Sequence, residues 1–239
     1  MIVTFANSKG GTGKSSSAAA LAQAATFKGM TALIVDADPQ GNASHILQCD
    51  TSRAGLFEVL EGRATAQEAI QATRTGPDAI AASWQLQGVR TSQGSAWRLK
   101  RALEPIKERY NLIIIDTQPA PGELQDNALA AAEYLIIPLS ADVLSLAGLF
   151  QIADTAQDFP GLQIMGYLLT RHSARTTLHK QITETIAAEA QRRNIPYLGA
   201  IRQGVALQEA QALQLNLYEY APRSNPAQDY LELLDKITK

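Results

Sequence analysis

One stretch of the sequence has residue types and spacing suited to binding phosphate. It covers residues 8–16 and reads Ser-Lys-Gly-Gly-Thr-Gly-Lys-Ser-Ser. A short apolar run precedes it and helix-forming residues follow it, which is the strand–turn–helix setting that a phosphate-binding P-loop requires. The glycines let successive backbone N–H groups converge on phosphate oxygens, and the start of the helix adds partial positive charge. The pattern therefore predicts binding of a nucleotide polyphosphate.

Two side chains of this loop have defined roles in that chemistry. Lys14 would reach the β- and γ-phosphates, and the Ser15 hydroxyl would ligate Mg²⁺. The ordinary Walker A pattern, G-x-x-x-x-G-K-[ST], fails at its first position, because Ser8 stands in place of glycine. A second lysine, Lys9, comes before the glycine pair. The predicted nucleotide-binding residues are Lys9, Gly10, Gly11, Thr12, Gly13, Lys14, Ser15 and Ser16.

Carboxylates follow two further apolar runs. Asp36 and Asp38 come after Leu33-Ile34-Val35, and Asp116 ends the run Leu112-Ile113-Ile114-Ile115. Ligands of open α/β sheets bind at the carboxyl ends of the strands, so these side chains are candidates for the same site. Asp116 fits a Walker B aspartate, which would hold Mg²⁺ through a water, because Mg²⁺ dehydrates reluctantly. The alternatives are a polar turn after the first run and a capping aspartate after the second.

Short apolar runs alternate with longer helical patterns, which predicts an α/β fold with a mostly parallel, twisted sheet covered by helices on both faces. Residues 1–239 show no linker, so we expect a single P-loop NTPase domain. The predicted strands are Ile2–Ala6, Thr31–Val35, around Ala79–Ala81, Leu112–Ile115, Tyr134–Ile137, Gln163–Leu169 and Tyr197–Ala200. The predicted helices are Ser15–Lys28, Thr65–Thr73, Ala96–Arg109, Glu123–Ala132, Leu146–Thr155, Thr176–Arg193, Leu207–Leu213 and Pro226–Ile237.

Composition excludes several classes of protein. The chain has 239 residues, a net charge of −2 and one cysteine, Cys49. A single cysteine rules out internal disulfides and CxxC metal sites and fits a reducing compartment. No apolar run approaches the roughly 18 residues of a membrane span. The first strand begins at once, which leaves no room for a signal peptide. We expect a cytoplasmic protein that needs no membrane.

The loop pattern K-G-G-x-G-K-[ST] is the deviant Walker A motif, and through it the chain resembles the ParA/MinD group of ATPases. The resemblance extends over nearly the whole length, through Asp36–Asn42, Asp116–Pro119, Glu133–Leu139, Leu168–Thr176 and Tyr220–Ser224. It is strongest with the short, Soj-like partition ATPases, which lack an N-terminal helix-turn-helix domain. It implies a slow Mg²⁺-dependent ATPase that uses ATP and acts as a switch.

The resemblance also implies roles for individual residues. Asp38 would help to orient the attacking water, and Asp36 would lie near the metal, so the predicted metal site comprises Ser15, Asp36 and Asp116. Lys14 already serves the bound nucleotide, and Lys9 would reach across a two-fold interface to the phosphates of the other subunit. The catalytic set is therefore Lys9, Lys14 and Asp38, and ATP would hold together a homodimer that hydrolysis releases.

A DNA-bound partition ATPase needs a basic surface. The segment from Arg171 to Arg202 carries six Lys/Arg and two acidic residues, so it is +4 in a chain of −2. The resemblance points to Arg175, with Arg171 and Arg202 as substitutes for a family arginine that is Ala206 here. It implies non-specific DNA binding, nucleoid association with ATP, a ParB-like activating partner, and partition of plasmid or chromosomal DNA. The base-side loop also departs from the family, because it reads Ile201-Arg202-Gln203-Gly204-Val205.

Other switches remain alternatives. An ATPase that positions a protein cargo would have the same sequence features. A MinD-like membrane switch needs a basic amphipathic tail, whereas residues 229–236 contain three acidic residues. An enzyme of the same superfamily that modifies a substrate would need further chemistry. The single cysteine cannot supply the ligands of an iron–sulfur cluster, and the three histidines are scattered along the sequence.

Overall fold

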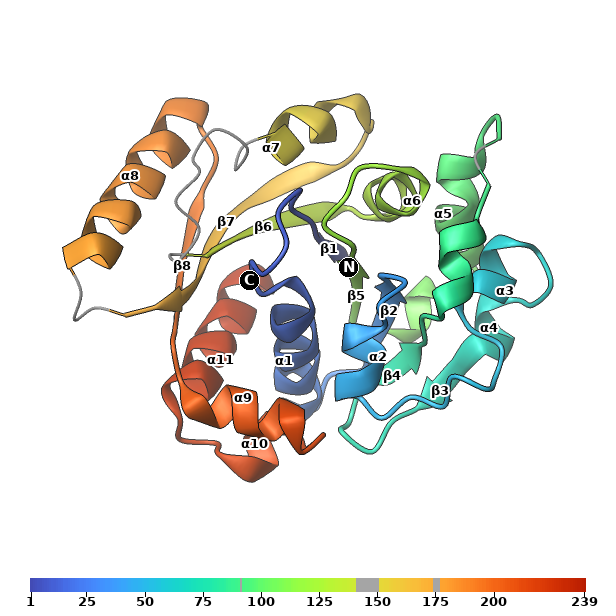
Figure 1. The fold of residues 1–239 in the computed structure, drawn as a ribbon, viewed down its shortest axis with the longest axis horizontal. Coiled ribbons are helices and arrows are strands. Elements are labelled where there is room, and N and C mark those ends of the chain that lie inside the picture. The colour runs from blue at the N-terminus through green and yellow to red at the C-terminus, as the bar shows by residue number, and fades with distance from the viewer. Residues whose placement is uncertain (91, 141–150, 174–176) are drawn as a thin grey trace.

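The computed structural model describes residues 1–90, 92–140, 151–173 and 177–239. Within these residues, eight strands form one sheet in the order β3-β4-β2-β5-β1-β6-β7-β8 (Figure 1). Neighbouring strands are parallel except β3 and β4, which are antiparallel at one edge. The strands are β1 Ile2–Phe5, β2 Ala32–Ala37, β3 Ile70–Ala72, β4 Asp78–Ile80, β5 Leu112–Thr117, β6 Tyr134–Ser140, β7 Gln163–His172 and β8 Tyr197–Arg202.

Helices cover both faces of this sheet (Figure 1). Side chains of β5 alternate between the two layers: Ile114 packs with α1 and α11, whereas Ile113 and Ile115 pack with α3, α5 and α6. The central strands are buried on both sides, as in other parallel sheets. The helices are α1 Lys14–Phe27, α2 Asn42–Ile46, α3 Leu56–Leu60, α4 Ala66–Ala69, α5 Arg98–Leu103, α6 Glu123–Ala131, α7 Gln151–Thr155, α8 Thr177–Arg193, α9 Val205–Ala212, α10 Leu217–Tyr220 and α11 Asn225–Ile237.

Helix α1 connects the glycine-rich loop to the core. Its residues from Ser17 to Ala25 are buried, and six of these nine are alanine. Alanine has the best helix propensity, and its small side chain lets a helix lie close to a sheet. The helix ends at Phe27, and Gly29, which follows the C-cap residue Lys28, has a φ of 80°, a left-handed conformation that glycine adopts without strain. This buried helix places the loop before it at the carboxyl ends of the strands.

The predicted α/β fold and the predicted strands are confirmed. Two predicted helices are partly wrong. The helix expected over Thr65–Thr73 ends at Ala69, and residues from Ile70 onward form β3, because pairing with β4 outweighs local helix propensity. The helix expected over Ala96–Arg109 is α5 flanked by two short 3₁₀ turns. Pro105 lacks the N–H that a continuous helix requires there.

Three short helices, α2, α3 and α10, are absent from the sequence-based prediction. Each has four or five residues, too few for a hydrophobic period to be recognised. Of the helix expected over Leu146–Thr155, residues from Gln151 onward are helical, and the rest lie outside the described residues. Residues Ser145–Leu149, a further segment that resembles the ParA/MinD group, also lie outside the described residues.

Replacing Ile114 by Ala should lower the free energy of unfolding by roughly 2–5 kcal/mol, because a fully buried side chain on a central strand leaves a cavity. Urea denaturation followed by circular dichroism measures the change. Leu213→Ala is the control, since Leu213 is 57% exposed and its loss should change the same quantity by under about 0.5 kcal/mol. Equal effects of the two variants would contradict the assigned core.

Candidate functional site: a nucleotide pocket at the carboxyl edge of the sheet

The glycine-rich loop joins β1 to α1 and has the backbone shape of a phosphate-binding turn. Gly11 and Gly13 have φ angles of 74° and 80°, in the left-handed region where other residues are strained. A Cβ on Gly13 would also lie 3.4 Å from Oγ1 of Thr170. The backbone conformation therefore favours glycine at position 13, and β7 lies at van der Waals distance from where a side chain would begin.

Two buried side chains that sequence reasoning missed support this loop. The Asn7 amide donates a 2.8 Å hydrogen bond to the carbonyl of Pro138, and its oxygen accepts one from the backbone N–H of Lys9 at 3.0 Å. The Thr170 hydroxyl contacts the carbonyl of Thr12 at 2.9 Å. These bonds hold the loop against β6 and β7. The only local signal was a polar residue, Asn7, at the end of a buried strand.

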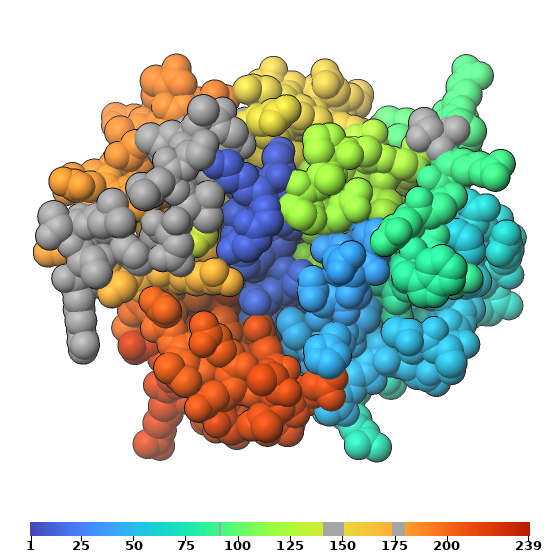
Figure 2. Space-filling model, viewed as in Figure 1, coloured from blue at the N-terminus to red at the C-terminus, as the bar shows by residue number. Residues whose placement is uncertain are grey.

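A pocket of about 480 Å³ opens over the loop. Figure 2 shows the dark blue loop in the centre of one face of the molecule, between α2 in light blue and the orange C-terminal helices. The pocket brings together the loop and residues from α2, α9 and the ends of β2 and β7. Its lining comprises residues 10–16 with Asp38, Gln40, Asn42, His45, Ile46, Pro119, Arg171, Gln211 and Ala212.

Lys14 is held at the base of this pocket. Its side chain is 6% exposed, and Nζ donates a 3.0 Å hydrogen bond to the carbonyl of Lys9. Burial lowers the pKa of Lys14, while the nearby charges of Asp116 and Asp38 act in the opposite direction. The structure therefore brings together the three side chains predicted to serve the γ-phosphate end of a nucleotide.

Asp116 is fully buried, and neither of its carboxylate oxygens has a hydrogen-bond partner in the described part of the chain. Burial, and secondly the charge of Asp36, raise the pKa of Asp116. The nearby Ser15 hydroxyl acts in the opposite direction, but the net pKa is still well above its ordinary value. A buried carboxylate without a partner is costly unless a ligand completes it. Asp116 beside Ser15 therefore fits Mg²⁺.

The described residues contain no group of three or more His, Cys, Asp or Glu side chains that could hold a metal. A Mg²⁺ ion bound with a nucleotide does not need such a group, because it is held by one or two carboxylates, by substrate phosphates and by water. The donor set of Asp116 and Ser15 agrees with that chemistry.

Asp36 is also buried, but its oxygens are engaged. Oδ1 accepts the backbone N–H of Asp38 at 3.1 Å, and Oδ2 accepts both the N–H and the hydroxyl of Ser44 at 2.7 Å. Burial raises the pKa of Asp36 to about 6, against the opposite effect of these hydrogen bonds. Asp36 therefore holds the segment that carries Asp38, and its role as a metal ligand stays a prediction.

A smaller pocket of about 130 Å³ adjoins the loop on the side of α9. Gln211 of α9 accepts a 3.0 Å hydrogen bond from the Ser16 hydroxyl, a contact that sequence reasoning missed. Gly204 lies at the start of α9, and a Cβ there would come within 2.7 Å of Pro226. The loop that departs from the family pattern is thus part of this second pocket.

Comparison with known proteins agrees with this geometry. A family model described as an AAA domain matches residues 1–161. The sporulation initiation inhibitor protein Soj of Bacillus subtilis is 34% identical over 99% of this chain and 97% of its own. The chromosome partitioning protein ParA of Caulobacter vibrioides is 32% identical over 99% of this chain and 93% of its own. The chain belongs to the ParA/MinD group of ATPases, with its relatives among the Soj-like proteins.

Solved structures support the ParA/MinD fold. The cobyrinic acid a,c-diamide synthase of Mycobacterium smegmatis, with a bound ATP analogue and magnesium, has a TM-score of 0.85 at 29% identity, over 99% of this chain and 93% of that one. The septum site-determining protein MinD of Pyrococcus horikoshii, complexed with Mg-ADP, has a TM-score of 0.83 at 24% identity, over 100% and 96%. The second likeness shows the fold alone.

The candidate DNA-binding arginines of this ParA-type chain differ in their surroundings. Arg171 is exposed, has a φ of 52° and lines both pockets. Arg202 is ion-paired with the buried carboxylate of Asp229, to which it also donates its backbone N–H at 2.7 Å. Arg175 lies outside the described residues. The structure therefore places one of the three at the nucleotide pocket and one in an ion pair.

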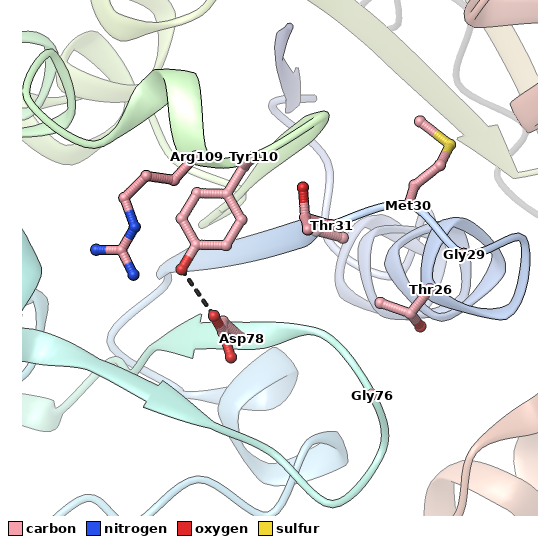
Figure 3. Close-up of a pocket in the computed structure, with 9 residues that line it drawn as sticks. Thr26, Gly29, Met30, Thr31, Gly76, Asp78, Arg109 and Tyr110 are labelled. Atoms are coloured by element: carbon pink, nitrogen blue, oxygen red, sulfur yellow. Dashed lines mark hydrogen bonds between the residues drawn. The ribbon is translucent and has the colours of Figure 1, made fainter.

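A separate pocket of about 480 Å³ opens near the amino ends of β2 and β5, away from the P-loop of this ParA-type fold (Figure 3). There the Tyr110 hydroxyl donates a 2.7 Å hydrogen bond to Asp78, beside the guanidinium of Arg109. This pocket contains none of the residues predicted to bind phosphate.

Lys14→Ala should weaken ATP binding in the presence of Mg²⁺ by roughly 30-fold or more, because it removes the buried charge that faces the phosphates. Isothermal titration calorimetry measures the affinity. Lys28→Ala is the control at the other end of α1, where Lys28 makes a 3.6 Å surface ion pair with Asp235. Surface pairs contribute little, so the control should bind as wild type does. Unchanged affinity in Lys14→Ala would contradict the assigned site.

Proposed function

We propose that this chain is a slow, Mg²⁺-dependent ATPase that converts ATP and water to ADP and phosphate and acts as a switch. The observation that carries the proposal is the buried Asp116 carboxyl group, whose oxygens lack a geometric hydrogen-bond partner among the described residues and lie near Ser15 and Lys14 of a P-loop of the deviant type. Mg²⁺, when bound, supplies positive charge that neutralises the phosphates. The solved structure at 29% identity that holds an ATP analogue and magnesium supports the same cofactors.

The positions of Lys14 and Asp38 in the pocket suit different roles in ATP hydrolysis. Lys14 is already oriented at the base of the pocket and would contact the β- and γ-phosphates. Asp38 is 5% exposed, lines the same pocket and would orient the attacking water. Phosphoryl transfer needs mainly positioning and charge stabilisation from the protein. The few, fixed side chains of this pocket meet that requirement.

We further propose that ATP holds two copies of the chain face to face, with Lys9 of each copy reaching the phosphates of the other. The P-loop lies at the centre of one face of the molecule, where Gly10 and Gly11 are exposed, so a second copy could approach it (Figure 2). Two facing polyphosphates repel each other, and a lysine supplied by the opposite subunit reduces that repulsion. Hydrolysis would remove the γ-phosphate and release the dimer.

Lys9→Ala should bind ATP but stay monomeric, whereas Asp38→Ala should bind ATP, hydrolyse it slowly and accumulate as a dimer. Size-exclusion chromatography with light scattering, run with ATP and Mg²⁺, separates these outcomes. Lys239→Ala serves as a control for the loss of one exposed lysine. The same dimer mass for Lys9→Ala and wild type would show that the lysine does not act across the interface.

We propose that the dimer binds DNA non-specifically and partitions or positions a cargo, most simply plasmid or chromosomal DNA, in a cytoplasmic, nucleoid-associated state. The names of the related partitioning proteins support this proposal. A ParB-like protein would stimulate hydrolysis. The exposed Arg171 and Lys180 would contribute to the surface together with Arg175. Arg202 contributes less, because Asp229 already neutralises it.

The structure does not support the two alternative functions, positioning of a protein cargo and a membrane switch, equally well. Positioning of a protein cargo would use the same nucleotide switch, and nothing in the pocket distinguishes it. A MinD-like membrane switch is less well supported, because the apolar face of α11, with Tyr230, Leu233 and Leu234, is buried in the core against α1. None of the described helices has the length and apolar character of a membrane span.

Arg175→Glu should abolish ATP-dependent binding to random-sequence duplex DNA and leave ATP-dependent dimerisation intact. In wild type, the logarithm of the affinity should fall with the logarithm of salt concentration by roughly 0.9 per phosphate contacted. Biolayer interferometry across a salt series measures both. The control is Arg101→Glu, an exposed arginine of α5 with the same change in charge. Full DNA binding by Arg175→Glu would place the basic surface elsewhere, and no binding by wild type at low salt would favour a protein cargo.

A further inference from the structure

Ser44 links three segments that meet behind the nucleotide pocket. Its backbone N–H and its hydroxyl both donate to Oδ2 of Asp36 at 2.7 Å. The same hydroxyl oxygen accepts the backbone N–H of Ala82 at 2.9 Å. All three residues are at most 2% exposed. One hydroxyl therefore connects α2, the end of β2 and the segment after β4, and water does not compete for its bonds.

The position of Asp38 depends on this connection. The Asp38 backbone N–H donates to Oδ1 of Asp36 at 3.1 Å, the other oxygen of the carboxylate that Ser44 holds. Downstream, the Asp38 side chain accepts the N–H of Gln40 at 2.9 Å, and its carbonyl accepts the N–H of Gly41 at 2.8 Å. Asp38 is thus anchored to the body of the protein through Asp36, and Asp36 is oriented by Ser44.

Rotation of the Asp36 carboxylate would disturb this anchor. Asp36 is in register with Asp116 on the neighbouring strand, so a rotated Asp36 carboxylate would face a second buried acidic side chain. Without the Ser44 hydroxyl, the Asp36 carboxylate would lose one of its three donors and the contact that sets its orientation. A small displacement of a group that positions a reactant is enough to slow a reaction.

We propose that Ser44 is a positioning residue for ATP hydrolysis: through Asp36 it sets the place of Asp38, and it does not itself touch the nucleotide. This inference rests on the proposed ATPase function. It predicts an effect on kcat rather than on nucleotide affinity, because the P-loop that binds the nucleotide is held in place by Asn7 and Thr170 and not by Ser44. Loss of the Ser44 hydroxyl should lower kcat and leave nucleotide affinity and KM nearly unchanged.

The test compares Ser44→Ala with wild type by steady-state ATP hydrolysis, calorimetric ATP affinity and thermal melting. We expect kcat to fall roughly ten-fold, equivalent to about 1.4 kcal/mol in the barrier, with KM and affinity within about two-fold. Ser95→Ala is the matched control, since Ser95 is also buried and its hydroxyl accepts a backbone N–H, from Ser92 at 3.0 Å. The control should hydrolyse ATP as wild type does, whatever its melting temperature.

A second pair of variants, Ser44→Thr and Ser44→Val, decides the question if Ser44→Ala does not fold. The two introduced side chains have nearly the same shape, and only threonine keeps the hydroxyl. Threonine should restore kcat and valine should not. Equal rates in this pair, a wild-type rate in Ser44→Ala, or a loss of affinity equal to the loss of kcat would each overturn the proposal. Absence of hydrolysis in wild type would instead overturn the ATPase function on which it rests.

Discussion

The nucleotide site is built around three ionisable side chains that are buried together at one edge of a parallel sheet. Asp36 and Asp116 stand side by side on β2 and β5, and Lys14 begins α1 beside them. Charges taken out of water are costly unless they are paired or hydrogen-bonded. Asp36 has three hydrogen-bond donors and Lys14 has one acceptor, while the oxygens of Asp116 have no geometric hydrogen-bond partner in the described part of the chain. Because Asp116 has the fewest hydrogen bonds of the three buried side chains, it is the one best suited to bind a ligand.

That arrangement draws the two ends of the chain into one site. The start of α1 contacts the C-terminal helices through Ser16, which bonds Gln211, and through Ser17, which lies 2.9 Å from the hydroxyl of Tyr230. Small residues along α1 let it lie between the sheet and α11. A nucleotide over the P-loop would therefore touch segments nearly 200 residues apart, so binding would stabilise the whole fold rather than one loop.

The features that could be predicted from the sequence are those set by residues that are close together in the chain. The placement of the P-loop, Asp38 and Asp116 at the carboxyl edge of the sheet follows from glycines, lysines and aspartates at the ends of apolar runs, and the α/β fold follows from the alternation of elements. Asn7, Thr170 and Gln211 could not be predicted, because their roles come from segments that meet only in the folded sheet. The change from helix to strand at Ile70 has the same cause, since β3 exists only by pairing with β4.

The formal charge of the segment from Arg171 to Arg202 also overstates the basic surface, because acidic residues from other segments pair with its arginines in the folded protein. Within the segment from Arg171 to Arg202, the charge of +4 already includes Glu189, which pairs with Arg192 and Arg193. Arg193 also pairs with Asp154, which lies outside that segment and lowers the effective charge further. Arg202 is neutralised by Asp229 from α11. The field that a nucleic acid would meet is thus weaker than a charge of +4 indicates. A single subunit would offer few exposed cations, and pairing two subunits would double them. Since affinity for DNA rises steeply with the number of phosphates contacted, dimerisation would then couple nucleotide state to anchoring without any change in the basic residues themselves.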